Sequence, residues 1–98
     1  IFIDTQRGHI YYFDSYGDKI PTRLMKFVRM VRKQGRHLGE KYKFKQTTRR
    51  HQYLSTECGM YSLFFVISLL EGKPIEYFDK KVTDKYMRKL RSIYFNKR

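Results

Sequence analysis

Apolar and aromatic residues open the chain in two short runs separated by a polar turn. Residues 1–4 are typical of a strand, and residues 9–13 are rich in β-prone aromatic side chains. The turn between them ends in Gly8, which reaches positive φ without strain. We therefore predict a β-hairpin over residues 1–13, followed by a second turn at residues 14–18.

Apolar residues next take up a helical spacing. The i, i+3, i+4, i+7 positions of one helix face are filled by Leu24, Phe27, Val28 and Val31. With Pro21 in the first turn and Gly35 at the end, this pattern predicts an amphipathic helix whose outer side is basic. Residues 42–48 then alternate like a half-buried strand. Residues 49–57 are predicted to form a loop.

From residue 58 to residue 70 nearly every position is apolar or small, which is typical of a buried helix. Gly72 is predicted to end that helix, and Pro74 prevents it from resuming. A last helix is predicted to begin with Thr83 as its N-cap and Asp84 in its first turn. Its expected apolar stripe consists of Tyr86, Leu90, Ile93 and Tyr94.

Composition bounds the classes of protein that this chain can belong to. The 98 residues make one domain or part of one, and 41% of them are hydrophobic, enough for a packed core. The longest apolar run, residues 63–70, is shorter than the ~18 residues that a membrane span needs. A single cysteine excludes an internal disulfide and favours an intracellular compartment. The chain opens within a strand without an initiator Met, so we expect its natural N-terminus to lie upstream.

Charge points to an anionic partner. Lys and Arg number 22 against 9 acids, a formal charge of +13. Such an excess favours nucleic acid or an acidic protein surface, although a merely solubilising surface explains it equally well. The residues expected to form one basic surface are Arg23, Lys26, Arg29, Arg32, Lys33, Lys43 and Lys45.

Cys58 stands where a loop meets the N-terminus of the buried helix. Free N–H groups and the helix dipole stabilise a thiolate there, which is the nucleophilic form of the side chain. Gly59 beside it leaves room for a substrate backbone. Free cysteines more often only pack, so position alone does not decide between the two roles.

Two further polar residues fit the same chemistry. Gln52, six residues before Cys58, can donate an amide N–H to the oxyanion of a tetrahedral intermediate. Asp14 ends the aromatic strand, where a carboxylate can hold a histidine in its reactive tautomer. The alternatives are an ordinary loop glutamine and a turn-initiating aspartate.

In combination these residues resemble the family of ubiquitin-like-protein-specific proteases, the group of SUMO proteases and the adenovirus protease. The matching motifs are Ile3-Asp4, Tyr11-Tyr12-Phe13-Asp14-Ser15, Gln52 and Glu57-Cys58-Gly59-Met60-Tyr61. The residues that make up these motifs are most similar to those of family members encoded by large DNA viruses. The resemblance implies that residues 1–98 are the C-terminal part of one cysteine protease catalytic domain. It also implies an α+β, papain-like fold, with a sheet packed on a central helix that starts at Cys58.

The family resemblance further implies a cysteine endopeptidase that cleaves after glycine-containing sites in viral polyproteins or ubiquitin-like modifiers. Its site would comprise Cys58 as nucleophile, Asp14 and Gln52. The catalytic histidine of the family is missing and is expected just upstream of Ile1, because His9, His37 and His51 are each better explained as surface or packing residues. The fragment alone is therefore expected to be inactive. The expected location is the host cytoplasm or nucleus, or the virion.

No metal or small cofactor is implied, although the adenovirus relative uses DNA as a cofactor. Two rival functions remain open at this point. A basic domain with interspersed aromatic residues can bind nucleic acid through phosphate contacts and base stacking. A protease-like scaffold without activity can bind a ubiquitin-like partner. Labelling of Cys58 by a thiolate-directed electrophile distinguishes an enzyme from these two rivals, because a protein that only binds has no reason to activate Cys58.

Overall fold

The computed structural model describes residues 1–54 and 57–95. Its elements, in chain order, are β1 (Phe2–Asp4), β2 (His9–Phe13), α1 (Thr22–His37), β3 (Lys43–Thr47), α2 (Cys58–Leu70), the 3-10 helix η1 (Ile75–Asp79) and α3 (Asp84–Phe95). The hairpin, the three longer helices and the strand after the first helix are therefore confirmed.

The three strands form one mixed sheet in the order β1-β2-β3. β1 and β2 pair antiparallel, with Ile3 opposite Ile10, and the turn between them places Gly8 at φ 72°. β2 and β3 pair parallel, with Ile10 opposite Phe44. A parallel pair requires a crossover, which α1 supplies.

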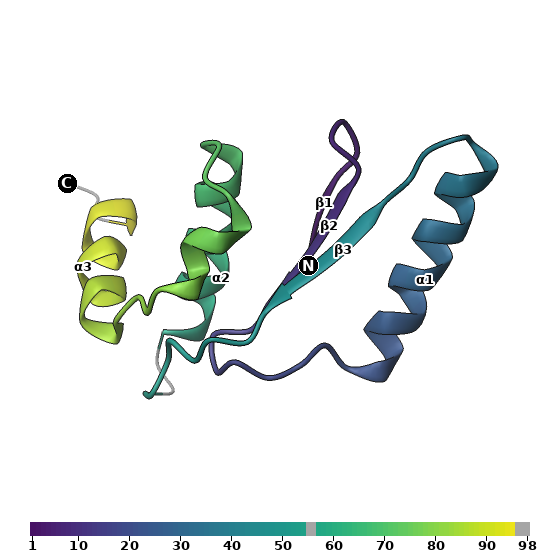
Figure 1. The fold of residues 1–98 in the computed structure, drawn as a ribbon. Helices are drawn as coiled ribbons and strands as arrows, with labels where there is room; N and C mark the ends of the chain where they lie inside the picture. Colours follow the sequence, from purple (N-terminus) through teal and green to yellow (C-terminus); the bar gives the residue numbers. More distant parts are fainter. Residues whose placement is uncertain (55–56, 96–98) are drawn as a thin grey trace.

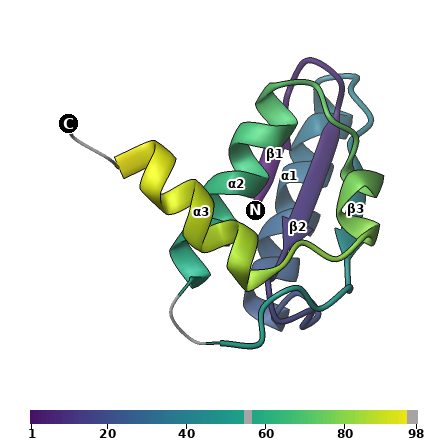
Figure 2. The ribbon, with the colours of Figure 1, turned by 90° about the vertical axis from the view of Figure 1, so that its left-hand side faces the viewer.

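Helices cover both faces of the sheet (Figures 1 and 2). α1 lies on one face, where Ile10 and Val28 are fully buried. α2 lies on the other face, with α3 beyond it. The main core occupies this second side and consists of Phe13, Met60, Tyr61, Phe64, Phe65, Ile75, Phe78, Met87 and Leu90. The predicted packing of the sheet on a helix that starts at Cys58 is confirmed.

The predicted end of α1 at Gly35 is wrong, because that glycine lies inside the helix. Gly35 is buried, and a Cβ there would lie 2.5 Å from Cδ2 of Tyr42. The glycine thus lets the Tyr42 ring pack on the helix backbone. The helix ends two residues later, at His37, and Gly39 beyond it has φ 79°. The Glu40 N–H donates to the Gly35 carbonyl at 2.8 Å, and the Gly39 N–H donates to the Arg36 carbonyl at 3.0 Å. This is a Schellman end.

Three expectations about burial need correction. Phe27 of the α1 stripe is 40% exposed, because a sheet of three strands is too narrow to cover the whole stripe. α2 is buried along one side, whereas Leu63 and Ile67 are only partly covered by its neighbours. On α3, Met87 and Leu90 face the core. The other residues of the predicted apolar stripe, Tyr86, Ile93 and Tyr94, are exposed.

Candidate active site

Cys58 is the first residue of α2, and it is exposed to solvent. The first N–H groups of any α-helix lack partners within the helix, so they favour a negative charge at this position. A Cβ added to Gly59 would meet no atom within 4 Å, which leaves open space beside the thiol. The predicted alternative, a cysteine that only packs in the core, is therefore wrong.

A buried carboxylate immediately precedes the thiol. Glu57 is 3% exposed, and its Oε1 forms an ion pair with Nη2 of Arg91 on α3 at 3.0 Å. A buried carboxylate without a partner would be costly and would oppose a neighbouring thiolate. Arg91 offsets this charge and ties α3 to the start of α2.

Gln52 is fully buried, and its amide is fixed in one orientation. Its Oε1 accepts a hydrogen bond from the Ser15 hydroxyl at 2.5 Å, and its Nε2 donates to the Leu54 carbonyl. The backbone N–H groups of His51 and Gln52 both donate to the Ser15 carbonyl at 2.8 Å. A primary amide carries two N–H donors, and one of those on Nε2 is taken up by the Leu54 carbonyl. The structure thus holds Gln52 firmly within the loop that leads to Cys58.

A buried polar network holds the same loop from the other side. His51 is fully buried; its Nδ1 accepts from the Val82 N–H at 2.8 Å, and its Nε2 donates to the Phe78 carbonyl at 3.0 Å. This arrangement requires the neutral ring, and burial lowers the pKa of His51 below its usual value. The hydroxyl of Tyr61 lies 3.1 Å from the His51 carbonyl oxygen, 2.9 Å from that of Val82 and 3.2 Å from Oδ1 of Asp84.

Asp84 links this network to the loop before Cys58. Its Oδ2 accepts from the backbone N–H groups of Tyr53 at 3.0 Å and Leu54 at 3.2 Å. Burial, together with the Asp84 carboxylate, raises the pKa of Tyr61 and keeps its hydroxyl protonated. α3 starts as predicted, because Oγ1 of Thr83 accepts from the Tyr86 N–H at 3.1 Å.

Asp14 occupies the turn that follows β2. Its Oδ2 accepts from the Asp18 N–H at 3.0 Å, which is the turn-forming role weighed above as an alternative. The next residue, Ser15, reaches Gln52, so the Asp14-Ser15 pair lies beside the loop that leads to Cys58. Within the described residues, no histidine contacts Asp14.

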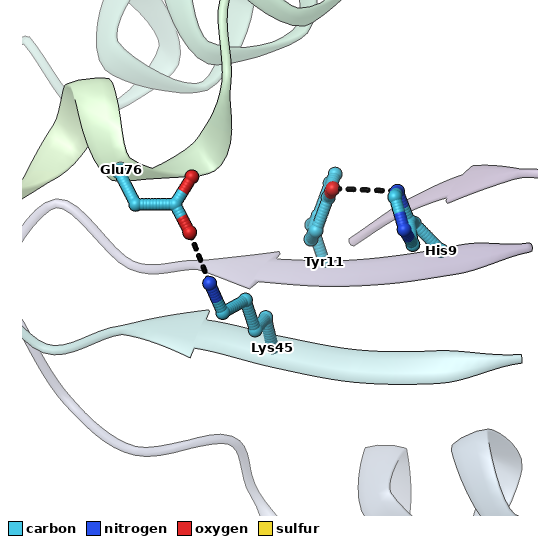
Figure 3. Close-up of polar contacts among 4 residues, drawn as sticks. All are labelled: His9, Tyr11, Lys45 and Glu76. Atoms are coloured by element: carbon cyan, nitrogen blue, oxygen red, sulfur yellow. Dashed lines mark hydrogen bonds and ion pairs between the residues drawn. The ribbon is translucent and has the colours of Figure 1, made fainter. Parts of the chain in front are cut away.

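The three histidines of the chain are engaged elsewhere. Nδ1 of His9 lies 2.7 Å from the Tyr11 hydroxyl, on the sheet face that carries α2 (Figure 3). His37 is exposed in the last turn of α1, and His51 is held in the core. These places agree with the prediction that none of them is the general base.

The structure divides the predicted basic surface between two places. The exposed residues of α1 that belong to it are Arg23, Lys26, Arg29 and Lys33. Lys43 and Lys45 instead line a groove on the α2 side of the sheet, together with Arg32, whose Nε donates to the Tyr42 carbonyl at 3.0 Å. Of the predicted α1 residues, Arg32 thus shares the groove with the strand lysines, whereas the other four lie on the exposed side of the helix.

A smaller pocket lies between the first turns of α2 and the end of α3. It has a volume of about 450 Å³ and is lined by Gly59, Met60, Leu63, Arg91 and Phe95. Among residues 1–54 and 57–95, no group of three or more His, Cys, Asp or Glu side chains is placed to hold a metal ion. In that same part of the chain, no helix is both long and apolar enough to cross a membrane.

Sequence reasoning assigned no part in the site to Ser15, Tyr61 or Asp84, and it treated His51 only as a surface or packing residue. Ser15 and Tyr61 lie inside the motifs shared with the family, and this was the only sequence feature that could have indicated a role for them. The contacts of His51 and Asp84 join residues about 30 positions apart, so no local pattern announces them.

An exposed thiol at the start of a central helix, with a mixed sheet behind it and a buried glutamine six residues earlier, is the arrangement of papain-like cysteine proteases. The model of the Ulp1 protease family, C-terminal catalytic domain, matches residues 1–97. The chain belongs to this family.

Curated relatives agree with this assignment. The SUMO-1 cysteine protease S273R of African swine fever virus (isolate Pig/Kenya/KEN-50/1950) is 34% identical over 100 residues, which cover 97% of this chain and 36% of the relative. Protein R355 of Acanthamoeba polyphaga mimivirus is 32% identical over 104 residues, which cover 97% of this chain and 32% of the relative. The predicted similarity to versions from large DNA viruses is confirmed.

A solved structure confirms the predicted α+β fold. The crystal structure of the selenomethionine form of the ASFV pS273R protease superimposes with a TM-score of 0.83 and 32% identity, and the match covers 92% of this chain and 34% of that one. The chain thus spans about a third of the length of the relatives that it matches.

Proposed function

We propose that the protein to which these residues belong is a cysteine endopeptidase with Cys58 as its nucleophile and Gln52 as an oxyanion donor. The observation that carries the proposal is the fixed amide of Gln52, buried and bonded to Ser15, six residues before an exposed thiol that starts α2.

The proposed reaction is acyl transfer. The Cys58 thiolate attacks the substrate carbonyl, and the resulting oxyanion accepts hydrogen bonds from Gln52 Nε2 and the Cys58 backbone N–H. A histidine protonates the leaving amine, and water then hydrolyses the thioester. The histidine is proposed to come from outside the 98 residues. A carboxylate accepts up to about four hydrogen bonds, so Asp14 retains acceptor capacity to orient that ring after serving its turn.

The proposed substrates are peptide bonds that follow glycine, in a viral polyprotein or a ubiquitin-like modifier. The name of the African swine fever virus relative, a SUMO-1 cysteine protease, supports a ubiquitin-like substrate. Open space at Gly59 supports a substrate backbone that passes close to the thiol. The single cysteine supports a site of action inside the infected cell or in the virion.

The test uses the full-length protein with two substrates, a SUMO precursor and a polyprotein-derived peptide with glycine before the scissile bond. Cys58→Ala is expected to abolish cleavage while the fold persists, because alanine suits a helix. Gln52→Ala is expected to lower kcat by about 10²–10³ with little change in KM. Undiminished turnover in either variant removes that residue from the mechanism.

Labelling with iodoacetamide at neutral pH distinguishes the enzyme from an inactive scaffold. An activated Cys58 is expected to react faster than a free cysteine peptide measured in parallel. A protein that binds a ubiquitin-like partner without such labelling or cleavage would be a scaffold, and the proposal would fail.

A further inference from the structure

The groove lined by Lys43, Lys45 and Arg32 lies at the opposite end of α2 from Cys58. It has a volume of about 790 Å³, within the range of ~300–1,000 Å³ typical of ligand sites. The three strands form its floor, and the turn from α2 into η1 forms its other wall. Leu69, which lines it, is eleven residues along α2 from the thiol, about 16 Å of helix. The groove is therefore separate from the proposed active site.

Basic side chains dominate the charge of this groove. Its lining includes five Lys and Arg residues against two acids, Asp4 and Glu76. Both acids already have partners. Glu76 pairs with Lys45 (Figure 3), and Oδ1 of Asp4 accepts from the backbone N–H groups of Gln6 and Arg7 at 3.0 Å.

The remaining cations have no acidic partner in the groove. Among the ion pairs of residues 1–54 and 57–95, none neutralises Arg7, Lys43 or Lys73. Lys73 instead stands over the Tyr77 ring, with Nζ 5.0 Å from its centroid. These three side chains come from the hairpin turn, β3 and the turn after α2, so they approach the groove from different sides.

The floor of the groove offers hydrogen bonds as well as charge. His9 and Tyr11 project from β2 toward the groove and are joined between Nδ1 and the phenol oxygen (Figure 3). Burial raises the pKa of Tyr11, so the phenol keeps its proton. Nε2 of His9 takes no part in this hydrogen bond and remains for a polar group of a bound segment.

We propose that this groove binds an acidic peptide segment of a partner protein in an extended conformation. The unpartnered cations receive its carboxylates, and the apolar walls at Phe2, Leu69 and Pro74 receive an apolar side chain. Such mixed walls, with Asp4 and Glu76 among them, suit a peptide better than a uniformly charged phosphate backbone. The proposal does not rest on the proposed protease activity.

Fluorescence anisotropy on the full-length protein tests the proposal. The probe is a labelled peptide of about eight residues, about 27 Å when extended, that alternates Glu with Leu. The measurement is made at about 50 mM salt, where charge interactions are weakly screened. The reference peptide carries Gln in place of each Glu, and a single-stranded oligonucleotide represents the other class of polyanion.

Two charge-matched variants locate the site. Lys43→Glu with Lys73→Glu is expected to weaken binding of the Glu-Leu peptide by about tenfold or more, because it reverses two groove charges. Lys26→Glu with Lys33→Glu changes the net charge equally on the exposed side of α1, and is expected to weaken binding less than about twofold. If the groove variant unfolds early in a thermal melt, Lys43→Gln with Lys73→Gln replaces it.

Several results overturn the proposal. These are no binding of the acidic peptide, equal binding of the Gln-containing peptide, or equal weakening by the two charge-matched variants. Tighter binding of the oligonucleotide, lost in the groove variant alone, would make nucleic acid the occupant instead.

Discussion

The hydroxyl of Ser15 donates a hydrogen bond to the side-chain oxygen of Gln52, across 37 positions of sequence, and both side chains are buried. An amide can turn over by rotation about its last side-chain torsion, which exchanges its oxygen and nitrogen. The Leu54 carbonyl can only accept, so it requires the nitrogen of the amide on its side, and the Ser15 hydroxyl then donates to Oε1 on the other. Leu54 and Ser15 together therefore fix which side of Gln52 presents N–H groups.

Ser15→Ala is expected to lower kcat by about twofold to tenfold with KM nearly unchanged, because a net hydrogen bond contributes about 0.5–1.5 kcal/mol. The decisive comparison is the double variant with Gln52→Ala. If Ser15 acts through Gln52, the double variant is no slower than Gln52→Ala alone. Additive losses would contradict a positioning role. The rate of Cys58 alkylation serves as a control and should not change.

Stability should depend on pH through His51. Unfolded histidine takes up a proton near pH 6.5, whereas burial lowers the pKa of His51 in the folded protein. The unfolded state therefore binds more protons below that pH, and the free energy of unfolding falls as the pH is lowered from about 7 toward 5. Thermal melts across this range measure the effect. His51→Gln should flatten the dependence, whereas His37→Gln, on an exposed side chain, should leave it intact.

Tyr61→Phe is expected to destabilise the protein by about 1–3 kcal/mol. The change removes a buried hydroxyl and leaves carbonyl oxygens of the 51–54 loop and the α3 entry without their donor. Denaturant unfolding measures this cost. Tyr77→Phe is the matched control, since Tyr77 is 37% exposed and its hydroxyl lies outside that network. Equal costs for both variants would show that the network contributes nothing specific.

Two glycines within helices should respond oppositely to alanine. Gly35→Ala is expected to lower the free energy of unfolding by about 1–3 kcal/mol, because its Cβ would lie 2.5 Å from the Tyr42 ring. Gly59→Ala is expected to leave stability unchanged or raise it by up to about 1 kcal/mol, because its Cβ enters open space and alanine favours helix. Denaturant melts of both variants check the signs. A stabilising Gly35→Ala would contradict the proposed role of this glycine.

Local patterns determined the elements of this protein. Period-two alternation predicted β3, helical spacing predicted α1, and the apolar run after Cys58 predicted α2, because each pattern depends only on neighbours in the chain. Thr83 likewise announced the start of α3, since an N-cap bonds to a backbone group three residues away. The candidates Cys58, Gln52 and Asp14 came from residue type, spacing and family resemblance.

Tertiary structure decided everything that depends on contacts between distant residues. Gly35 looked like a helix end, but the Tyr42 ring that packs on it belongs to the segment just before β3. The basic residues looked continuous along the chain, yet the crossover from β2 through α1 to β3 separates most of those on α1 from Lys43 and Lys45, and Arg32 is the α1 residue that reaches their groove. Ser15 and Gln52 meet because β2 and β3 pair side by side, so that the segments after both strands leave the sheet together. The sequence therefore indicated which chemical groups the site contains. Which of these groups are in contact was decided by strand pairing and packing, because packing depends on distances in space and not on separation along the chain.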